Sequence, residues 1–162
     1  MVFIIDKLVT NTSERQQALQ AVANIETLVQ PEDPWTKKTL AEMLAQDSMY
    51  ILIVYKPEQK AGYKIVGYCL YQVVFEQAEI LRIGTHPDYQ RQGIASQLFA
   101  TLNNELINNK VESLLLEVRA DNAPALALYE QQGLTVIHKR KGYYQLPHQP
   151  SVDALIMQRV YD

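Results

Sequence analysis

Hydrophobic residues recur along the chain with two different periods, and these predict both helices and strands. From Ile94 to Leu106 every fourth residue is apolar, which is the spacing of one buried helix face. The three leucines at 114–116 would be apolar on both faces of a strand, so residues 112–118 are expected to form a buried central strand.

The same patterns divide the rest of the chain. A strand is expected at 2–9, followed by a helix that Thr12 or Ser13 caps and whose apolar stripe is Ala18, Val22, Ile25 and Leu28 or Val29. A helix at 36–45 and strands at 49–55, 63–75 and 79–85 come next. After the helix from Ile94 and the strand at 112–118, we expect a helix capped by Asn122 and strands at 134–139 and 151–160. A turn is expected around Gln77, and a loop rich in Tyr, Pro and His between the last two strands. This order predicts an α/β (α+β) fold, with a mixed, twisted sheet of seven strands flanked by about four helices. Residues 1–162 are expected to form a single domain, since this length is usual for one.

The composition excludes several classes of protein. The 162 residues include one cysteine, Cys69, which rules out an internal disulfide framework and fits a reducing compartment such as the cytoplasm. The net charge is −3, whereas proteins that bind nucleic acids usually present a basic face. No apolar stretch reaches the length of a membrane span, and the first ten residues look like a strand rather than a signal peptide. We therefore expect a cytoplasmic protein without direct nucleic-acid or membrane contact.

Residues 80–95 have the pattern of a strand, a polar turn and the start of a helix. The free N–H groups at a helix start carry partial positive charge, so phosphates bind there when small residues allow close approach. Gly93 and Ala95 are such small residues, and Arg91 adds a full charge. These residues alone indicate an anion site, and they leave open the alternative that Gly93 only shapes a turn and Arg91 is solvated. The stretch is neither a Walker loop nor a dinucleotide-binding Gly-x-Gly-x-x-Gly motif.

The same segment carries a specific resemblance. Residues 90–95, Gln-Arg-Gln-Gly-Ile-Ala, match the Gln/Arg-x-x-Gly-x-Gly/Ala signature of the GCN5-related N-acetyltransferase (GNAT) superfamily. Further blocks in the right order resemble, more narrowly, the bacterial ribosomal-protein-alanine N-acetyltransferases; they lie at 86–93, 116–119, 127–134, 140–144 and 154–157. The similarity covers most of the chain from Trp35 onward. One departure is Ala95, where close relatives often carry glycine.

The resemblance implies that acetyl-CoA is the co-substrate. Its diphosphate would be held by the turn formed by Arg91, Gln92, Gly93, Ile94, Ala95 and Ser96. Its pantetheine arm would pair like an extra strand with the backbone of Ile83, Gly84 and Thr85. Asn122 matches a further position that contacts the coenzyme. The three histidines show no metal-ligand spacing, so no metal is expected.

Acetyl transfer to an amine requires a proton acceptor for the nitrogen and a proton donor for the leaving thiolate. The resemblance assigns the acceptor role to Glu117 and the donor role to Tyr129. Glu117 ends an apolar strand run, a setting that favours proton uptake by a carboxylate, although a salt bridge with Arg119 or a solvated strand end would fit as well. Tyr129 also fits an ordinary core tyrosine with a hydrogen-bonded hydroxyl.

The resemblance further implies that Trp35, Tyr143 and Tyr144 line the acceptor site, and aromatic packing over the sheet is the alternative for all three. The expected reaction is acetyl transfer to a primary amine by direct attack. The expected acceptor is the N-terminal α-amine of a protein or peptide, such as a ribosomal protein. Two alternatives are an enzyme of the same fold that acetylates a small amine, such as a polyamine or an antibiotic, and a non-catalytic acetyl-CoA-binding module. The presence of both Glu117 and Tyr129 argues against the module.

Overall fold

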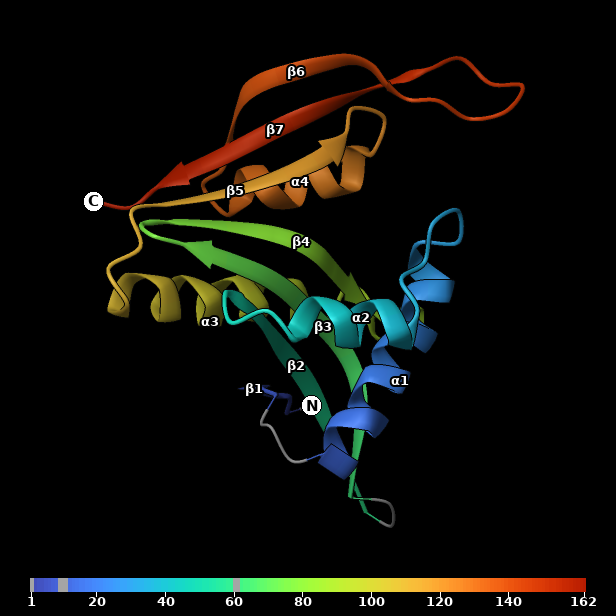
Figure 1. The fold of residues 1–162 in the computed structure, drawn as a ribbon, viewed down its shortest axis with the longest axis vertical. Coiled ribbons are helices and arrows are strands. Elements are labelled where there is room, and N and C mark those ends of the chain that lie inside the picture. The colour runs from blue at the N-terminus through green and yellow to red at the C-terminus, as the bar shows by residue number, and fades with distance from the viewer. Residues whose placement is uncertain (1, 9–11, 60–61) are drawn as a thin grey trace.

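The computed structural model describes residues 2–8, 12–59 and 62–162, which form one mixed β-sheet with helices on both faces (Figure 1). The elements are, in chain order, β1 (Ile4–Lys7), α1 (Thr12–Val29), α2 (Lys37–Leu44), β2 (Met49–Glu58), β3 (Gly62–Val74), β4 (Gln77–Thr85), the short 3-10 helix η1 (Pro87–Tyr89), α3 (Ile94–Asn108), β5 (Ser113–Arg119), α4 (Ala123–Gln131), β6 (Thr135–Tyr144) and β7 (Val152–Val160). In the sheet the strands follow the order β1-β2-β3-β4-β5-β7-β6. The predicted fold class and the predicted order of strands and helices are confirmed.

Neighbouring strands are antiparallel except for β4 and β5, which run parallel. These two strands pair over only four positions, residues 77–80 against residues 113–116. β4 then continues to Thr85 and β5 to Arg119, and the strands separate (Figure 1). We call this region, residues 81–85 of β4 and 117–119 of β5, the β4–β5 fork. A bulge at Leu81, which has no partner in the ladder with β3, marks where it begins.

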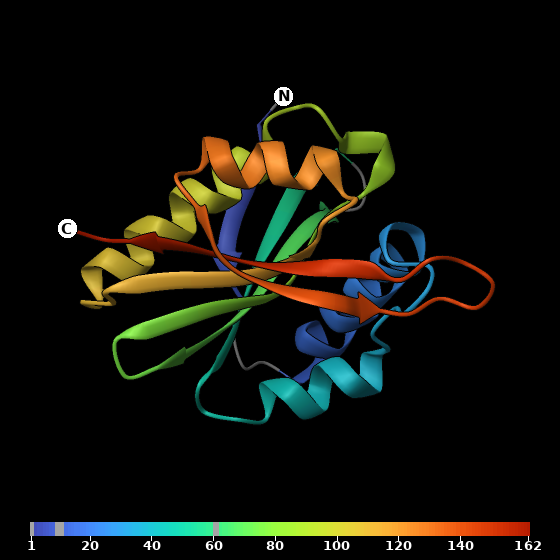
Figure 2. The same cartoon turned by 90° about the horizontal axis from the view of Figure 1, so that it is seen from above.

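Both faces of the sheet are covered at β2, β3 and β4, which explains the runs of consecutive apolar residues in β2 and β3. Helices α3 and α4 lie on one face, and α1 and α2 lie on the other (Figure 2). Successive side chains of β2 alternate between the two cores: Leu52 and Val54 face α3, whereas Ile51 and Ile53 face α1. An apolar run in the sequence is therefore the consequence of burial on two sides.

The helices begin and pack largely as their sequence signals predict. The four stripe residues of α3, at every fourth position from Ile94 to Leu106, are each at most 2% exposed. The side chain of Asn122 caps α4 by accepting a hydrogen bond from the backbone N–H of Ala125 at 3.3 Å. Thr36 caps α2 in the same way, with the N–H of Thr39 at 3.1 Å.

Two predictions for the N-terminal region need correction. The first strand begins at Ile4 rather than at residue 2, and its expected end at Val9 lies outside the described residues. Helix α1 already includes Thr12 and Ser13, so neither is the residue before it. Leu28 is 54% exposed, so the stripe of α1 ends at Val29 instead.

Two predictions for loops were also wrong. Gln77 belongs to β4 and pairs with Val74, because the tight turn lies at residues 75–76. Strand β6 extends to Tyr144, which pairs with Val152 of β7, so Tyr143 and Tyr144 lie on a strand and not in a loop. The hydrogen bonds of the β6–β7 hairpin outweigh the turn-forming tendency of this segment.

Candidate active site

The turn before α3 combines two left-handed backbone conformations with open space beside Gly93. Arg91 and Gly93 both have left-handed backbone conformations, with φ angles of 63° and 81°. Left-handed residues that alternate with residues of negative φ turn neighbouring N–H groups toward one point, and the first N–H groups of α3 have no partner within the helix. No side chain of the described residues caps this helix, and a Cβ added at Gly93 would meet no atom within 4 Å. Among the described residues, neither a capping side chain nor an atom close to Gly93 therefore stands against the predicted anion site.

The predicted phosphate-binding residues lie together on this one turn, whereas Asn122 lies elsewhere. Ser96 receives a hydrogen bond from the side chain of Gln132, at the C-terminal end of α4, at 3.4 Å. Asn122 caps the other end of α4, which is nine residues long, or about 13 Å at 1.5 Å per residue. A ligand that contacts both Ser96 and Asn122 has to extend along α4.

The second predicted coenzyme segment, 83–85, is the β4 arm of the β4–β5 fork. These residues pair with β3 on one side and have no β5 partner on the other. The side chain of Gln90 donates to the carbonyl of Thr85 at 3.2 Å, which leaves Ile83 and Gly84 as the open backbone. Gly84 packs against Tyr68, since a Cβ at this position would lie 2.6 Å from the Tyr68 hydroxyl.

Glu117 lies on the β5 arm of the fork, on the face opposite to α3 and α4. The hydroxyl of Tyr144 donates to Oε1 of Glu117 at 3.2 Å, and Nη1 of Arg140 lies 3.7 Å from Oε2. Arg119 is not its partner, because the Arg119 guanidinium pairs with Asp121 and Glu32 instead. The expected apolar setting is therefore wrong: a phenol and a guanidinium surround the carboxylate.

Glu79 is a second carboxylate on the same face. It stands opposite Leu115 in the parallel ladder, two positions before Glu117. Burial, and then the charge of Glu117, raise the pKa of Glu79, while Arg140 acts in the opposite direction. Two acidic groups, one in the fork and one just before it, therefore share the field of one arginine.

Tyr129 lies on the other face of the sheet. Its side chain is 8% exposed, and its ring meets that of Phe99 edge-on at 5.8 Å between centroids. Burial raises the pKa of Tyr129 to about 12, so the phenol stays protonated at neutral pH. Among the described residues its hydroxyl has no hydrogen-bond partner. Glu117 and Tyr129 thus face opposite sides of the sheet, and the β4–β5 fork lies beside Glu117.

A buried cluster that sequence reasoning missed lies near the predicted acceptor residue Trp35. Its centre is Glu26 on α1, whose carboxylate accepts hydrogen bonds from the Arg82 guanidinium, the Tyr68 hydroxyl and the backbone N–H of Trp35. The guanidinium of Arg82 also lies 4.9 Å from the centroid of the Trp35 ring. Glu26 lies directly after the stripe residue Ile25, and no local signal in the sequence distinguishes it from a surface glutamate.

The other two predicted acceptor residues lie side by side on β6. The rings of Tyr143 and Tyr144 meet edge-on at 5.2 Å between centroids, and the Arg140 guanidinium lies over Tyr143 at 5.2 Å. Tyr144 reaches Glu117, whereas half of the Tyr143 surface is exposed. The structure therefore joins Tyr143 and Tyr144 with Glu117, while Trp35 belongs to the Glu26 cluster.

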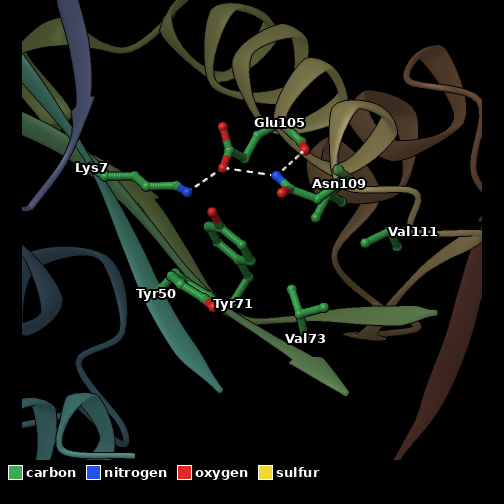
Figure 3. A pocket seen from close by; sticks show the side chains of 8 residues that line it. Lys7, Tyr50, Tyr71, Val73, Glu105, Asn109 and Val111 are labelled. Atoms are coloured by element: carbon green, nitrogen blue, oxygen red, sulfur yellow. Dashed lines mark hydrogen bonds and ion pairs between the residues drawn. The ribbon is translucent and has the colours of Figure 1, made fainter. Parts of the chain in front are cut away.

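A cavity of about 120 Å³ lies apart from these residues, between β2, β3 and the C-terminal part of α3 (Figure 3). Lys7, Glu105 and Asn109 form a polar network on its wall. The hydroxyl of Tyr71 is buried beside it without a hydrogen-bond partner among the described residues. This cavity shares no residue with the predicted site.

The described part of the chain contains no group of three or more His, Cys, Asp or Glu residues arranged to hold a metal ion. Burial raises the pKa of Cys69 to about 12, so this residue stays a thiol in the core at neutral pH. None of the described helices is long and apolar enough to cross a membrane.

Comparison with known proteins places this geometry in a family. Residues 19–134 match the model of the acetyltransferase (GNAT) family. The chain is 38% identical over 111 residues to the ribosomal protein bS18-alanine N-acetyltransferase of Escherichia coli (strain K12). The aligned region covers 68% of this chain and 71% of that protein. The chain is 34% identical over 124 residues to the enzyme of the same name from Salmonella typhimurium (strain LT2), covering 76% and 79%.

The likeness extends to the structure. The crystal structure of the ribosomal-protein-S18-alanine N-acetyltransferase from Escherichia coli matches with a TM-score of 0.80 and 33% identity, covering 98% of this chain and 94% of that one. The family model thus covers more than half of the sequence, and the fold is shared with the Escherichia coli structure. The chain belongs to the acetyltransferase (GNAT) family.

Proposed function

We propose that this chain uses acetyl-CoA to acetylate the N-terminal α-amine of a protein whose first residue is alanine, such as a ribosomal protein. The observation that carries the proposal is the β4–β5 fork, whose open backbone at Ile83 and Gly84 adjoins a strand that carries Glu117. The names of the relatives that are 34–38% identical support the choice of acceptor. The absence of a membrane-spanning helix among the described residues is compatible with action in the cytoplasm.

The turn before α3 suits the diphosphate of acetyl-CoA. The N–H groups of residues 91–96 would bind the phosphate oxygens, and the open space at Gly93 would let them approach the backbone. Ala95 has a Cβ where close relatives often carry glycine, which we expect to weaken binding slightly. The open edge of β4 would hold the pantetheine arm, and Asn122 would contact the coenzyme further along α4. When bound, acetyl-CoA supplies an activated acetyl thioester and leaves as a thiolate.

Glu117 would accept the proton that the acceptor amine loses. An α-amine has a pKa near 8, so about a tenth of it is already neutral at pH 7, whereas a lysine side chain is harder to deprotonate by about 2.5 units. Tyr144 and Arg140 hold the two oxygens of the Glu117 carboxylate, which fixes its orientation. An oriented carboxylate can accept the proton directly or through one water molecule.

Tyr129 would stabilise the leaving sulfur. A thiol has a pKa of about 8.5, and the pKa of Tyr129 is about 12, so complete proton transfer from the phenol would be uphill by about 3.5 units. A hydrogen bond from the Tyr129 hydroxyl to the sulfur avoids this cost, because the proton is shared and not lost. We therefore propose that Tyr129 acts as a hydrogen-bond donor that assists departure.

The acceptor would lie on the Glu117 face, between Tyr143 and Tyr144 on one side and Trp35 on the other. Glu117 lines neither the cavity beside Lys7 nor a second cavity that Trp35 lines, so neither of these two offers an enclosed pocket for a small amine beside Glu117.

A competition assay tests the acceptor. Acetyl transfer is measured by mass spectrometry with three acceptors at equal concentration: a peptide that begins with alanine, an N-terminally blocked peptide that contains lysine, and spermidine. We expect acetylation of the alanine amine at least 100-fold faster than of the other two. Preferential acetylation of lysine or of spermidine would refute the proposed acceptor.

A further inference from the structure

Glu26 is the one fully buried carboxylate among the described residues, with an exposed fraction of 0%. Its Oε1 accepts hydrogen bonds from Nε and Nη2 of Arg82, at 3.0 and 2.6 Å, and from the backbone N–H of Trp35, at 2.9 Å. Its Oε2 accepts a hydrogen bond from the hydroxyl of Tyr68. A carboxylate is buried only at high cost unless such donors surround it, so the three segments that supply them, β3, β4 and the loop before α2, have to meet α1 at one point.

The donors attach the loop between α1 and α2, residues 30–36, to the β4 arm of the fork. Besides the Trp35 N–H, this loop offers the carbonyl of Asp33, to which Nη2 of Arg82 donates at 2.6 Å. Arg82 lies directly after the bulge that opens the fork. One guanidinium therefore binds the helix α1 carboxylate and the loop backbone together, and it also stacks on the Trp35 ring.

The same loop is attached to the β5 arm. Glu32 accepts a hydrogen bond from Nη1 of Arg119 at 3.1 Å, and the Arg119 guanidinium lies 5.5 Å from the centroid of the Tyr144 ring. Tyr144 in turn donates to Glu117. The loop therefore spans the two strands that separate at the fork, with an arginine on each of them.

The cluster also borders the open backbone of β4. The Tyr68 hydroxyl that binds Glu26 is the atom against which Gly84 packs, with no room for a Cβ between them. The position of the Glu26 carboxylate is therefore tied to the Gly84 backbone through Tyr68 and to the Trp35 backbone directly. A shift of the carboxylate would move the loop relative to the strand.

We infer that Glu26 is a positioning residue, which fixes the loop at residues 30–36 across the fork so that this loop forms the acceptor side of the site. The inference rests on the proposed function, because it assumes that the acceptor amine meets Glu117 there. A buried ion pair adds little net stability, since desolvation offsets most of the attraction, but its hydrogen bonds have fixed directions. The arrangement suits the placing of a loop better than the stabilising of a core.

Steady-state kinetics with Arg82→Lys tests the inference. Lysine keeps the charge, but it lacks the rigid planar guanidinium that binds the Glu26 carboxylate and the Asp33 carbonyl at the same time. We expect the KM for the acceptor peptide to rise at least tenfold, kcat to change less than threefold, and the Kd for acetyl-CoA to change less than twofold. The matched control is Arg159→Lys, which alters a bond to the carbonyl of residue 132 and a contact with the Tyr161 ring, and should leave all three constants within twofold. An unchanged acceptor KM in Arg82→Lys would overturn the inference.

Hydrogen exchange gives a readout that does not depend on activity. In Glu26→Gln we expect the N–H of Trp35 to exchange at least tenfold faster, while the buried N–H groups of α3 keep their wild-type rates and show that the protein is folded. If Glu26→Gln does not fold, Arg82→Lys serves for the same measurement. Wild-type protection of the Trp35 N–H would refute the anchoring of the loop. If the wild-type enzyme did not acetylate the alanine peptide, the proposed function would fail, and hydrogen exchange would still decide whether Glu26 holds the loop.

Discussion

The hydroxyl of Tyr144 donates a hydrogen bond to the carboxylate of Glu117 over 3.2 Å, and so links β6 to the β5 arm of the fork. Burial, followed by the charge of Glu117, raises the pKa of Tyr144 to about 12. The phenol therefore remains a donor at every pH at which acetyl transfer is practical. Because Arg140 approaches the other carboxylate oxygen, the two contacts together set the direction in which Glu117 faces the acceptor.

Removal of this hydroxyl should slow the reaction without abolishing it. A hydrogen bond to a charged group contributes about 1.5 kcal/mol, so Tyr144→Phe should lower kcat about tenfold. The rate is measured with saturating acetyl-CoA and an alanine peptide. Tyr63→Phe is a suitable control, because Tyr63 is 61% exposed on β3, away from the fork. A Tyr144→Phe enzyme with wild-type kcat would show that the bond does not orient Glu117.

Tyr129→Phe should impair turnover more than stability. The hydroxyl has no partner among the described residues, so its loss should change the free energy of unfolding by less than about 1 kcal/mol. If the hydroxyl assists the leaving sulfur, kcat should fall by about 100-fold, with an unchanged Kd for acetyl-CoA. Urea unfolding and steady-state rates on the same preparation separate these effects. An unaffected kcat would make Tyr129 an ordinary core residue.

The buried phenols and the thiol predict how stability depends on alkaline pH. Burial raises the pKa of Tyr129 and of Cys69 to about 12, from ordinary values near 10 and 9. Below about pH 9 both groups are protonated in the folded and unfolded states, so their contribution to stability is fully present. Between pH 9 and 12 the unfolded state loses protons that the folded state retains, and stability falls by up to about 1.4 kcal/mol per pH unit and group.

Urea unfolding at intervals of half a unit from pH 8 to 11 checks this expectation. The midpoint should stay level to about pH 9 and then decline. The decline should be shallower in Tyr129→Phe, because this variant lacks one of the groups whose pKa is raised in the folded state. A midpoint that is constant up to pH 11 would show that these side chains are less buried in solution.

Gly84→Ala should destabilise the protein and disturb coenzyme binding together. The new Cβ would lie 2.6 Å from the Tyr68 hydroxyl, which cannot easily move because it donates to the buried Glu26. Overpacking of this kind costs about 1–3 kcal/mol of unfolding free energy. In a Tyr68→Phe background the cost should be smaller, since the nearest clashing atom is absent, and a double-mutant cycle measures the difference. Additive costs would indicate that the β4 backbone moves away instead.

The features that could be predicted from the sequence are those that neighbouring residues encode. The stripe of α3 is visible because its members recur every fourth position, and the phosphate-binding turn is contiguous from Arg91 to Ser96. Asn122 was recognised as a cap because the helix that it caps starts at the next residue. In each case the physical cause acts over a few residues.

The surroundings of the reacting groups could not be predicted, because they depend on pairs that are distant in the sequence. Glu26 meets Tyr68 and Arg82, which follow it by 42 and 56 residues. Tyr144 reaches Glu117 across 27 residues, and only after a register shift in β6 that no local pattern indicates. For this reason the sequence predicts an apolar setting for the Glu117 carboxylate, whereas Tyr144 and Arg140 are its polar neighbours in the structure.

The central claim is that Glu117 accepts the proton of the attacking amine at the β4–β5 fork. The most direct test is the rate of acetyl transfer to an alanine peptide by Glu117→Gln, with binding of acetyl-CoA followed by calorimetry on the same protein. Glutamine keeps the size and the acceptor oxygen but is a poor base, so kcat should fall at least 100-fold while the Kd for acetyl-CoA stays within twofold. Turnover at the wild-type rate by a correctly folded Glu117→Gln enzyme would contradict the claim.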